Sequence, residues 1–145
     1  AGMGTTVVTV VVTGEVAHVV HVGDSRAYLI GPDGAQQLTT DHSMVQEMVD
    51  NGRLTEQQAR VHPQKNIITR ALGVEPTVLV DYGEFTFAGR SLVLLCTDGL
   101  SNYLEPETLY ALSQQYTGHE LAEQLIEKAK AGGGGDNITV AIIEN

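Results

Sequence analysis

The feature that most constrains this chain is the stretch of residues 92–100, an apolar run that ends abruptly in Asp98 and Gly99. A short, continuous apolar run is typical of a strand that is buried on both faces. We therefore expect Asp98 to lie at the end of that strand, where the chain leaves the core and Gly99 allows a sharp turn. Taken alone, the pattern indicates only a strand followed by an Asp-Gly turn.

The pairing of glycine with aspartate recurs twice along the chain. Gly23-Asp24 closes a second apolar run, and Gly135-Asp136 opens the last one. We expect three aspartates at strand ends to converge, although three bare carboxylates held close together repel one another and have raised pKa values. Such a group is stable around cations, and an all-oxygen ligand set favours Mg²⁺ or Mn²⁺.

Length and composition limit the class of protein. The 145 residues are enough for one domain with a core, and the formal net charge of −10 argues against a nucleic-acid-binding surface. The single cysteine, Cys96, excludes an internal disulfide, and its place in an apolar run indicates an inert core thiol. No run is long enough to cross a membrane and none has the pattern of a signal peptide, so we expect a cytoplasmic protein.

Periodicity predicts β segments on either side of a helical insertion. The insertion, at about residues 44–66, has Ser43 as N-cap of a first helix and a capping box of Thr55 and Gln58 at the start of a second. Its high polar content is typical of a mobile flap. One further helix is predicted to begin near Pro106, and the next carries Leu121, Leu125, Ile126 and Ala129 on one face. The predicted strands are 5–12, 16–22, 27–30, 36–38, 77–87, 92–96 and 138–143.

The histidines and the glycine run do not form a motif of their own. His18 and His21 are three residues apart in a strand, so they point to opposite faces and cannot hold one metal ion together. We expect His42 and His62, which flank the insertion, to lie on the surface. The four glycines before Asp136 are either a flexible connector or a metal-binding loop, and the residues alone leave both open.

A series of short motifs runs the length of the chain in a fixed order. They are residues 2–6 (GMGTT), 22–26 (VGDSR), 40–43 (TDHS), 70–73 (RALG), 96–100 (CTDGL) and 134–139 (GGDNIT). Each motif is weak by itself, but the ordered set resembles the metal-dependent, type 2C serine/threonine protein phosphatases. The likeness is to compact bacterial members of that family.

The resemblance implies an α+β fold, an antiparallel β-sandwich flanked by helices, with residues 1–145 forming a single phosphatase-like domain. It also implies that the domain is N-terminally incomplete. Family members carry upstream motifs: an arginine that binds the phosphate, an Asp-Gly that bridges two metals and a histidine that protonates the leaving group. The chain begins after all three, so we assign no catalytic residue within it with certainty.

The resemblance also implies a set of metal ligands. A complete family member holds two or three Mn²⁺ or Mg²⁺ ions, and two of them share a bridging water that attacks phosphorus. Matched residue by residue, Asp98 and Asp136 would hold the second catalytic ion, and Asp24 and Asp98 a third, weaker one. Residues expected to support the metal loops are Gly99, Gly135 and Asn137.

The leading hypothesis is a bacterial protein phosphatase that hydrolyses phosphoserine and phosphothreonine, with the chain as given impaired by its missing motifs. Its expected partners are phosphorylated proteins and a cognate serine/threonine kinase, with no nucleic acid or membrane partner. A homo-oligomer that covers missing strands is also expected. The alternatives are a non-catalytic phosphatase-like binding or regulatory module, and a sporulation-type regulatory phosphatase domain.

Overall fold

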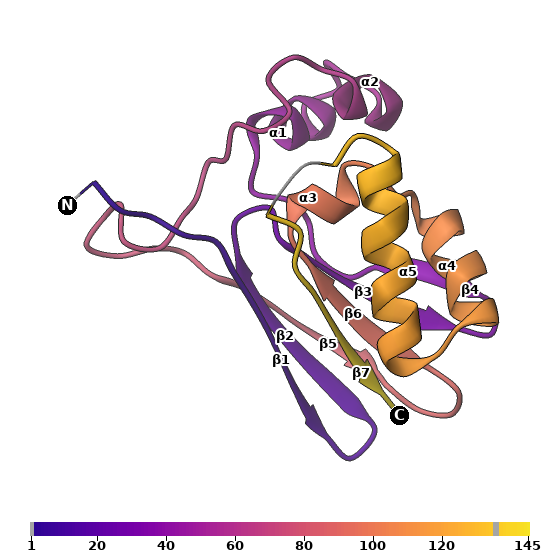
Figure 1. The fold of residues 1–145 in the computed structure, drawn as a ribbon. Helices are drawn as coiled ribbons and strands as arrows, with labels where there is room; N and C mark the ends of the chain where they lie inside the picture. The colour runs from indigo at the N-terminus through magenta and orange to yellow at the C-terminus, as the bar shows by residue number, and fades with distance from the viewer. Residues whose placement is uncertain (1, 135–136) are drawn as a thin grey trace.

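A computed structural model describes residues 2–134 and 137–145 of the chain, and it consists of two stacked antiparallel sheets with helices (Figure 1). The predicted α+β sandwich is confirmed. One sheet has the strand order β1-β2-β5 and the other β4-β3-β6-β7. The strands are β1 (Val7–Thr13), β2 (Val16–Val22), β3 (Arg26–Gly31), β4 (Gly34–Gln37), β5 (Asp81–Thr86), β6 (Leu92–Cys96) and β7 (Val140–Glu144).

The helices fall into two groups (Figure 1). The pair α4 and α5 lies against the β4-β3-β6-β7 sheet, whereas α1 and α2 form the predicted insertion at one end of the molecule. No helix in the described residues is long and apolar enough to cross a membrane. The helices are α1 (Met44–Asp50), α2 (Glu56–Arg60), α3 (Asp98–Ser101), α4 (Pro106–Gln115) and α5 (Gly118–Ala131).

Strand β6 is buried on both faces, as its apolar sequence predicts. Leu94 packs beneath the helices in a core cluster with Leu109 and Leu121, whereas Val93 points the other way and packs with Phe87 between the sheets. Because neighbouring residues of a strand point to opposite faces, only a continuous apolar run can satisfy both cores. The end of β6 is therefore fixed on both sides, which fixes the position of the residues that follow it.

The predicted strand at residues 77–87 is shorter in the structure. Strand β5 begins only at Asp81, where its pairing with β2 begins, opposite His21. Tyr82 on this strand is 57% exposed and faces solvent. Gly83 marks no bulge: it pairs in regular register, and the Phe85 ring lies 2.9 Å from where a Cβ would be. The glycine thus makes room for a neighbouring aromatic ring.

The insertion has the helix caps that the sequence predicts. Ser43 accepts a hydrogen bond from the backbone of Gln46, and Thr55 and Gln58 form a complete capping box. The insertion contacts the ends of α3 and α4 through an Asn102–Asn66 side-chain hydrogen bond of 3.2 Å and an Arg60–Glu105 ion pair of 3.5 Å. Helix α2 has no buried residue. The mobility expected of a flap remains a prediction.

Candidate metal centre

The loop that carries Asp24 is held in one conformation by glycine and by its neighbours. Gly23 follows β2 directly and has a φ of +107°, a backbone conformation that residues other than glycine rarely adopt. A Cβ at this position would overlap the side chain of Thr6. Ser25, two residues after Gly23, is buried, and its Oγ hydrogen-bonds Thr6 Oγ1 at 2.8 Å. Asp24, between them, is half-buried.

Asp98 lies at the end of β6, as predicted, but it begins the short helix α3 and does not sit in a simple turn. Thr97 is the N-cap residue, and the Asp98 carbonyl accepts a hydrogen bond from the Asn102 backbone. A Cβ on Gly99 would lie 2.6 Å from the Asn137 carbonyl oxygen. Asn137 itself has a φ of +64°. Two of the predicted support residues, Gly99 and Asn137, are therefore in close backbone contact.

The segment after Asn137 is fastened to the start of α3. Thr97 donates its backbone N–H to the Thr139 carbonyl at 3.1 Å, and Thr97 Oγ1 accepts the Thr139 N–H, also at 3.1 Å. Residues 137–139 thus run beside residues 97–99 although they are 40 positions apart in the sequence. Asp136 and Gly135, the other two predicted site residues, lie outside the described residues. The convergence of all three aspartates therefore remains a prediction.

The electrostatics of Asp24 indicate a site that needs a cation. The pKa of Asp24 is raised from 3.8 to about 6, mainly by burial and then by the negative charges of Asp98 and Asp41. Asp41 is already neutralised by Arg26. Within the described ranges, no lysine, arginine or histidine forms an ion pair with Asp24 or Asp98. Adjacent carboxylates without a cationic partner suit a hard divalent ion.

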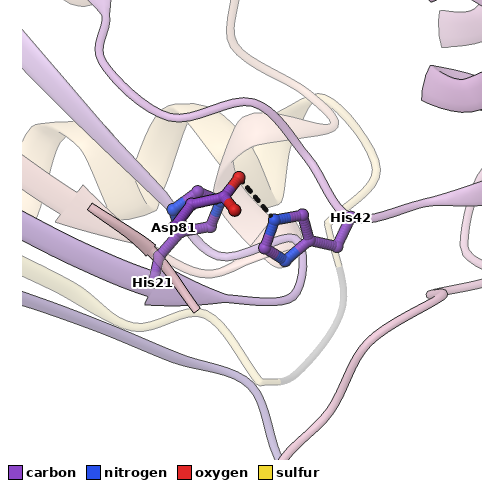
Figure 2. Close-up of side chains that lie close together, drawn as sticks. All are labelled: His21, His42 and Asp81. Carbon is purple, nitrogen blue, oxygen red and sulfur yellow. Dashed lines mark hydrogen bonds and ion pairs between the residues drawn. The ribbon is translucent and has the colours of Figure 1, made fainter. Parts of the chain in front are cut away.

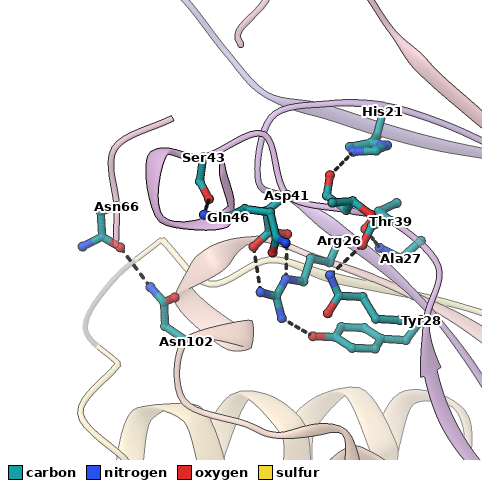
Figure 3. Close-up of polar contacts among 12 residues, drawn as sticks. His21, Arg26, Ala27, Tyr28, Thr39, Asp41, Ser43, Gln46, Asn66 and Asn102 are labelled. Atoms are coloured by element: carbon teal, nitrogen blue, oxygen red, sulfur yellow. Dashed lines mark hydrogen bonds and ion pairs between the residues drawn. The ribbon is translucent and has the colours of Figure 1, made fainter. Parts of the chain in front are cut away.

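Arg26 belongs to the framework of the site. It forms a bidentate pair with Asp41, through Nε at 2.8 Å and one terminal nitrogen at 2.7 Å (Figure 3). Its other terminal nitrogen donates to the hydroxyl of Tyr28, which is fully buried, at 2.9 Å. A paired fork of this kind holds both partners in a fixed geometry. The arginine nearest in sequence to Asp24 is therefore already bound within the protein.

A cluster of two histidines and an aspartate lies close by, and the sequence did not predict it. In the part of the chain that the structure describes, His21, His42 and Asp81 hold ligand-type atoms all within 4.8 Å of one another (Figure 2). The expectation that His42 lies on the surface was wrong, because it is only 6% exposed. His18 and His21 do point to opposite faces, as predicted: His18 bonds Tyr82, and His21 bonds the Thr40 carbonyl.

Cys96, the residue two positions before Asp98, has no part in the chemistry. Its side chain is buried, and that burial raises the pKa of the thiol to about 12. A thiol with such a pKa carries almost no thiolate at neutral pH and is a poor nucleophile. The structure therefore agrees with the interpretation of Cys96 as a core residue.

The sequence profile of the protein phosphatase 2C family matches residues 1–130 of the chain. A serine/threonine phosphatase of Listeria innocua is 44% identical over 144 residues, which cover 99% of this chain and 57% of that protein. This chain thus spans somewhat more than half the length of that relative.

Solved structures of bacterial phosphatases have the same fold. The serine/threonine phosphatase of S. agalactiae superposes with a TM-score of 0.90 at 39% identity, over 97% of this chain and 59% of that one. The catalytic domain of the phosphatase PstP, solved in complex with two manganese ions, superposes with a TM-score of 0.83 at 37% identity, over 99% and 59%. With the family profile, these likenesses fix the assignment. The chain belongs to the protein phosphatase 2C family.

Proposed function

We propose that this chain forms the metal-binding part of a protein phosphatase that hydrolyses phosphoserine and phosphothreonine. The observation that carries the proposal is the half-buried carboxyl group of Asp24, whose raised pKa reflects burial and the neighbouring charge of Asp98. A carboxylate in such surroundings is costly unless a cation is present. The named relatives are serine/threonine phosphatases, which supports this class of substrate.

Each predicted site residue has a role in this proposal. Asp98 and Asp136 hold one Mn²⁺ or Mg²⁺ ion, and Asp24 and Asp98 hold a further, weaker one. When bound, such ions lower the pKa of a water molecule and neutralise charge on the phosphoryl oxygens. Gly99 and Asn137, in contact through the Asn137 carbonyl, shape the loop at Asp98. Gly135 completes that support in the proposal.

We expect the 145-residue chain to hydrolyse phosphate esters slowly by itself. Two residues of the neighbouring framework that could bind phosphate or move a proton are already engaged: Arg26 with Asp41, and His42 with Gly23 and Asp81. Phosphorylated proteins as substrates, a cognate serine/threonine kinase and a cytoplasmic location are further parts of the proposal. So is association with a second copy of the chain.

A chimera with the Listeria innocua phosphatase tests the function directly. The 144-residue stretch of that enzyme which aligns with this chain is replaced by this chain, and hydrolysis of a phosphothreonine peptide is measured with and without Mn²⁺. The proposal predicts Mn²⁺-dependent activity that Asp98→Asn reduces by at least about 100-fold, as expected when a metal ligand of the reaction is lost.

The control variant is Asp33→Asn, in the exposed turn between β3 and β4, which should leave the activity unchanged. A folded chimera that binds Mn²⁺ but does not hydrolyse the peptide would contradict the proposal and favour the non-catalytic binding module. Activity that survives Asp98→Asn would contradict the metal assignment itself.

A further inference from the structure

The cluster of His21, His42 and Asp81 has the residue types of a transition-metal site. A metal ion needs a free lone pair on each imidazole. His42 Nδ1, however, accepts the backbone N–H of Gly23 at 2.9 Å, which leaves the ring proton on Nε2, where it is donated to Asp81 Oδ2 at 2.8 Å (Figure 2). Both nitrogens of His42 are occupied. The cluster is therefore not arranged to bind a metal.

The same contacts fix the backbone on both sides of Gly23. Gly23 donates its N–H to the His42 ring, and its carbonyl accepts the backbone N–H of His42 at 3.0 Å. One residue thus binds both polar groups of Gly23, each in a buried setting. Because Gly23 has an unusual φ of +107°, these two hydrogen bonds fix the direction in which the chain leaves β2. The residue aimed by that turn is Asp24.

The His42 ring is oriented in turn by a further set of contacts. Asp81 accepts the His42 Nε2 proton on one carboxylate oxygen and Arg70 at 3.1 Å on the other. His21 stacks on the His42 ring, with centroids 4.4 Å apart and planes within 15°. His21 also hydrogen-bonds the Thr40 carbonyl, and Figure 3 shows this bond of the His21 ring. Burial lowers the pKa of His21, which favours the neutral form of its ring.

We propose that His42, Asp81 and Arg70 form a positioning chain, here called the Gly23 clamp, that presents the Asp24 carboxylate beside Asp98 for metal binding. His42 and Asp81 act through Gly23 and do not touch the metal. The clamp also reaches the segment after the flap, because Thr69 donates its backbone N–H to the His42 carbonyl at 2.9 Å. The inference rests on the proposed role of Asp24 as a metal ligand.

Two substitutions of His42 separate the two halves of the clamp. His42→Asn keeps an acceptor near the Nδ1 position and loses the donor to Asp81, whereas His42→Gln keeps a donor near Nε2 and loses the acceptor for Gly23. We expect His42→Gln to weaken Mn²⁺ binding at the Asp24 site by about tenfold, the effect of one lost buried hydrogen bond. His42→Asn should weaken it less, and Asp81→Asn by an intermediate amount.

Matched controls come from the same strands. His18→Gln on β2 and Glu84→Gln on β5 alter a histidine and an acid that contact Tyr82 on the other face of the sheet, and Mn²⁺ affinity should not change.

Mn²⁺ binding to the 145-residue chain is followed by calorimetry, with urea unfolding measured for every variant. Amide hydrogen exchange at Gly23 is the second measurement, and it should become faster in His42→Gln but not in His18→Gln.

The inference is overturned if His42→Gln and Asp81→Asn bind Mn²⁺ like the wild-type chain while the Gly23 amide stays protected. It is also overturned if the chain binds Zn²⁺ and both His21→Gln and His42→Gln abolish that binding, because His42 would then be a ligand. Failure of the proposed function looks different. In that case no Mn²⁺ binding depends on Asp98, yet exchange at Gly23 still responds to His42→Gln.

Discussion

Asp24 is the residue at which the electrostatic cost of the metal-free site can be measured. Its carboxyl group is half-buried next to Asp98, and its pKa is raised to about 6 in the fold, first by burial and then by that neighbouring charge. A raised folded-state pKa means that the ionised form is less stable in the folded than in the unfolded chain. The metal-free protein therefore stores an electrostatic penalty that a bound cation would relieve.

This penalty predicts a pH dependence of stability in the presence of a chelator. Below pH about 4 Asp24 is protonated in both the folded and the unfolded chain, and it carries no electrostatic penalty. As the pH rises through about 6 the folded chain must ionise this half-buried carboxyl group, so the free energy of unfolding should fall over that interval. Asp24→Asn should remove this fall and stabilise the chelated protein at pH 7 by about 1 kcal/mol, a figure reduced for solvent screening of a group that is partly exposed.

Urea unfolding at a series of pH values checks this prediction, with Asp33→Asn in an exposed turn as the control. Identical pH profiles for the wild-type chain and Asp24→Asn would contradict it. Added Mn²⁺ should raise the stability of the wild-type chain at pH 7 and leave Asp24→Asn less affected, since ligand binding to the folded state stabilises that state.

Gly99 offers a test of the backbone contact at Asp98. A methyl group there would meet the Asn137 carbonyl at 2.6 Å, so Gly99→Ala must displace the segment after Asp136. We expect a loss of about 1–3 kcal/mol in unfolding free energy, typical of an overpacked site, together with weaker Mn²⁺ binding. Gly31→Ala is the control, because its nearest neighbouring atom lies 3.9 Å away. Unchanged Mn²⁺ affinity in Gly99→Ala would exclude this contact from a role in the site.

Among the helices of the described residues, α2 in the flap is the one that buries no side chain. Helix α2 has no buried residue and begins with a capping box at Thr55. Loss of an N-cap costs a helix about 1 kcal/mol. Thr55→Ala should therefore speed amide exchange within Glu56–Arg60, while the free energy of global unfolding stays within about 0.5 kcal/mol of the wild-type value.

The control for the flap is Ser43→Ala, which removes the cap of α1 at a buried residue near the sheets. That substitution should lower global stability as well as local protection. Equal global destabilisation by Thr55→Ala and Ser43→Ala would mean that α2 unfolds only with the whole domain. The prediction of an independently mobile flap would then be wrong.

The elements also show which parts of the fold a sequence can predict. The capping box at Thr55 depends on four neighbouring residues, and β6 on a local apolar run, so both were correct. The start of the predicted strand at residues 77–87 was wrong, because β5 begins only at Asp81, where its pairing with β2 begins. The role of Gly83 could not be predicted either. In the structure that glycine accommodates the Phe85 ring, a packing detail that no local pattern contains.

The sequence predicted the residues of the candidate site that follow a local pattern and missed those that depend on tertiary contacts. Asp24 and Asp98 could be located because each ends an apolar run beside a glycine, and the structure brings them close enough for one charge to shift the pKa of the other. His42 was missed because its burial depends on Gly23 and Asp81, which are 19 and 39 positions away. Only the folded arrangement brings those partners together.

In the whole molecule, the two sheets differ in how they are covered. Helices α4 and α5 pack on the β4-β3-β6-β7 sheet, while the outer face of the β1-β2-β5 sheet carries exposed side chains such as Val11, at 55%, and Tyr82, at 57%. In the described residues β1 pairs only with β2, so its outer edge is open. Exposed apolar residues beside an open edge favour pairing with another chain.

We therefore expect the chain to self-associate. Sedimentation velocity over a range of concentrations should show species larger than the monomer, and Val11→Lys should shift the distribution toward monomer. Val61→Lys alters a valine of the flap that is 82% exposed, and it should leave the distribution unchanged. A single monomeric species at every concentration would count against this prediction.

The most direct test of the central claim, that acidic residues from distant parts of the chain form one cation site, is a Mn²⁺ titration of the 145-residue chain and of Asp98→Asn. The account predicts that the wild-type chain binds Mn²⁺, that Asp98→Asn loses nearly all of that binding, and that Asp33→Asn retains it. Absence of Mn²⁺ binding by the wild-type chain, or equal binding by Asp98→Asn, would contradict the account.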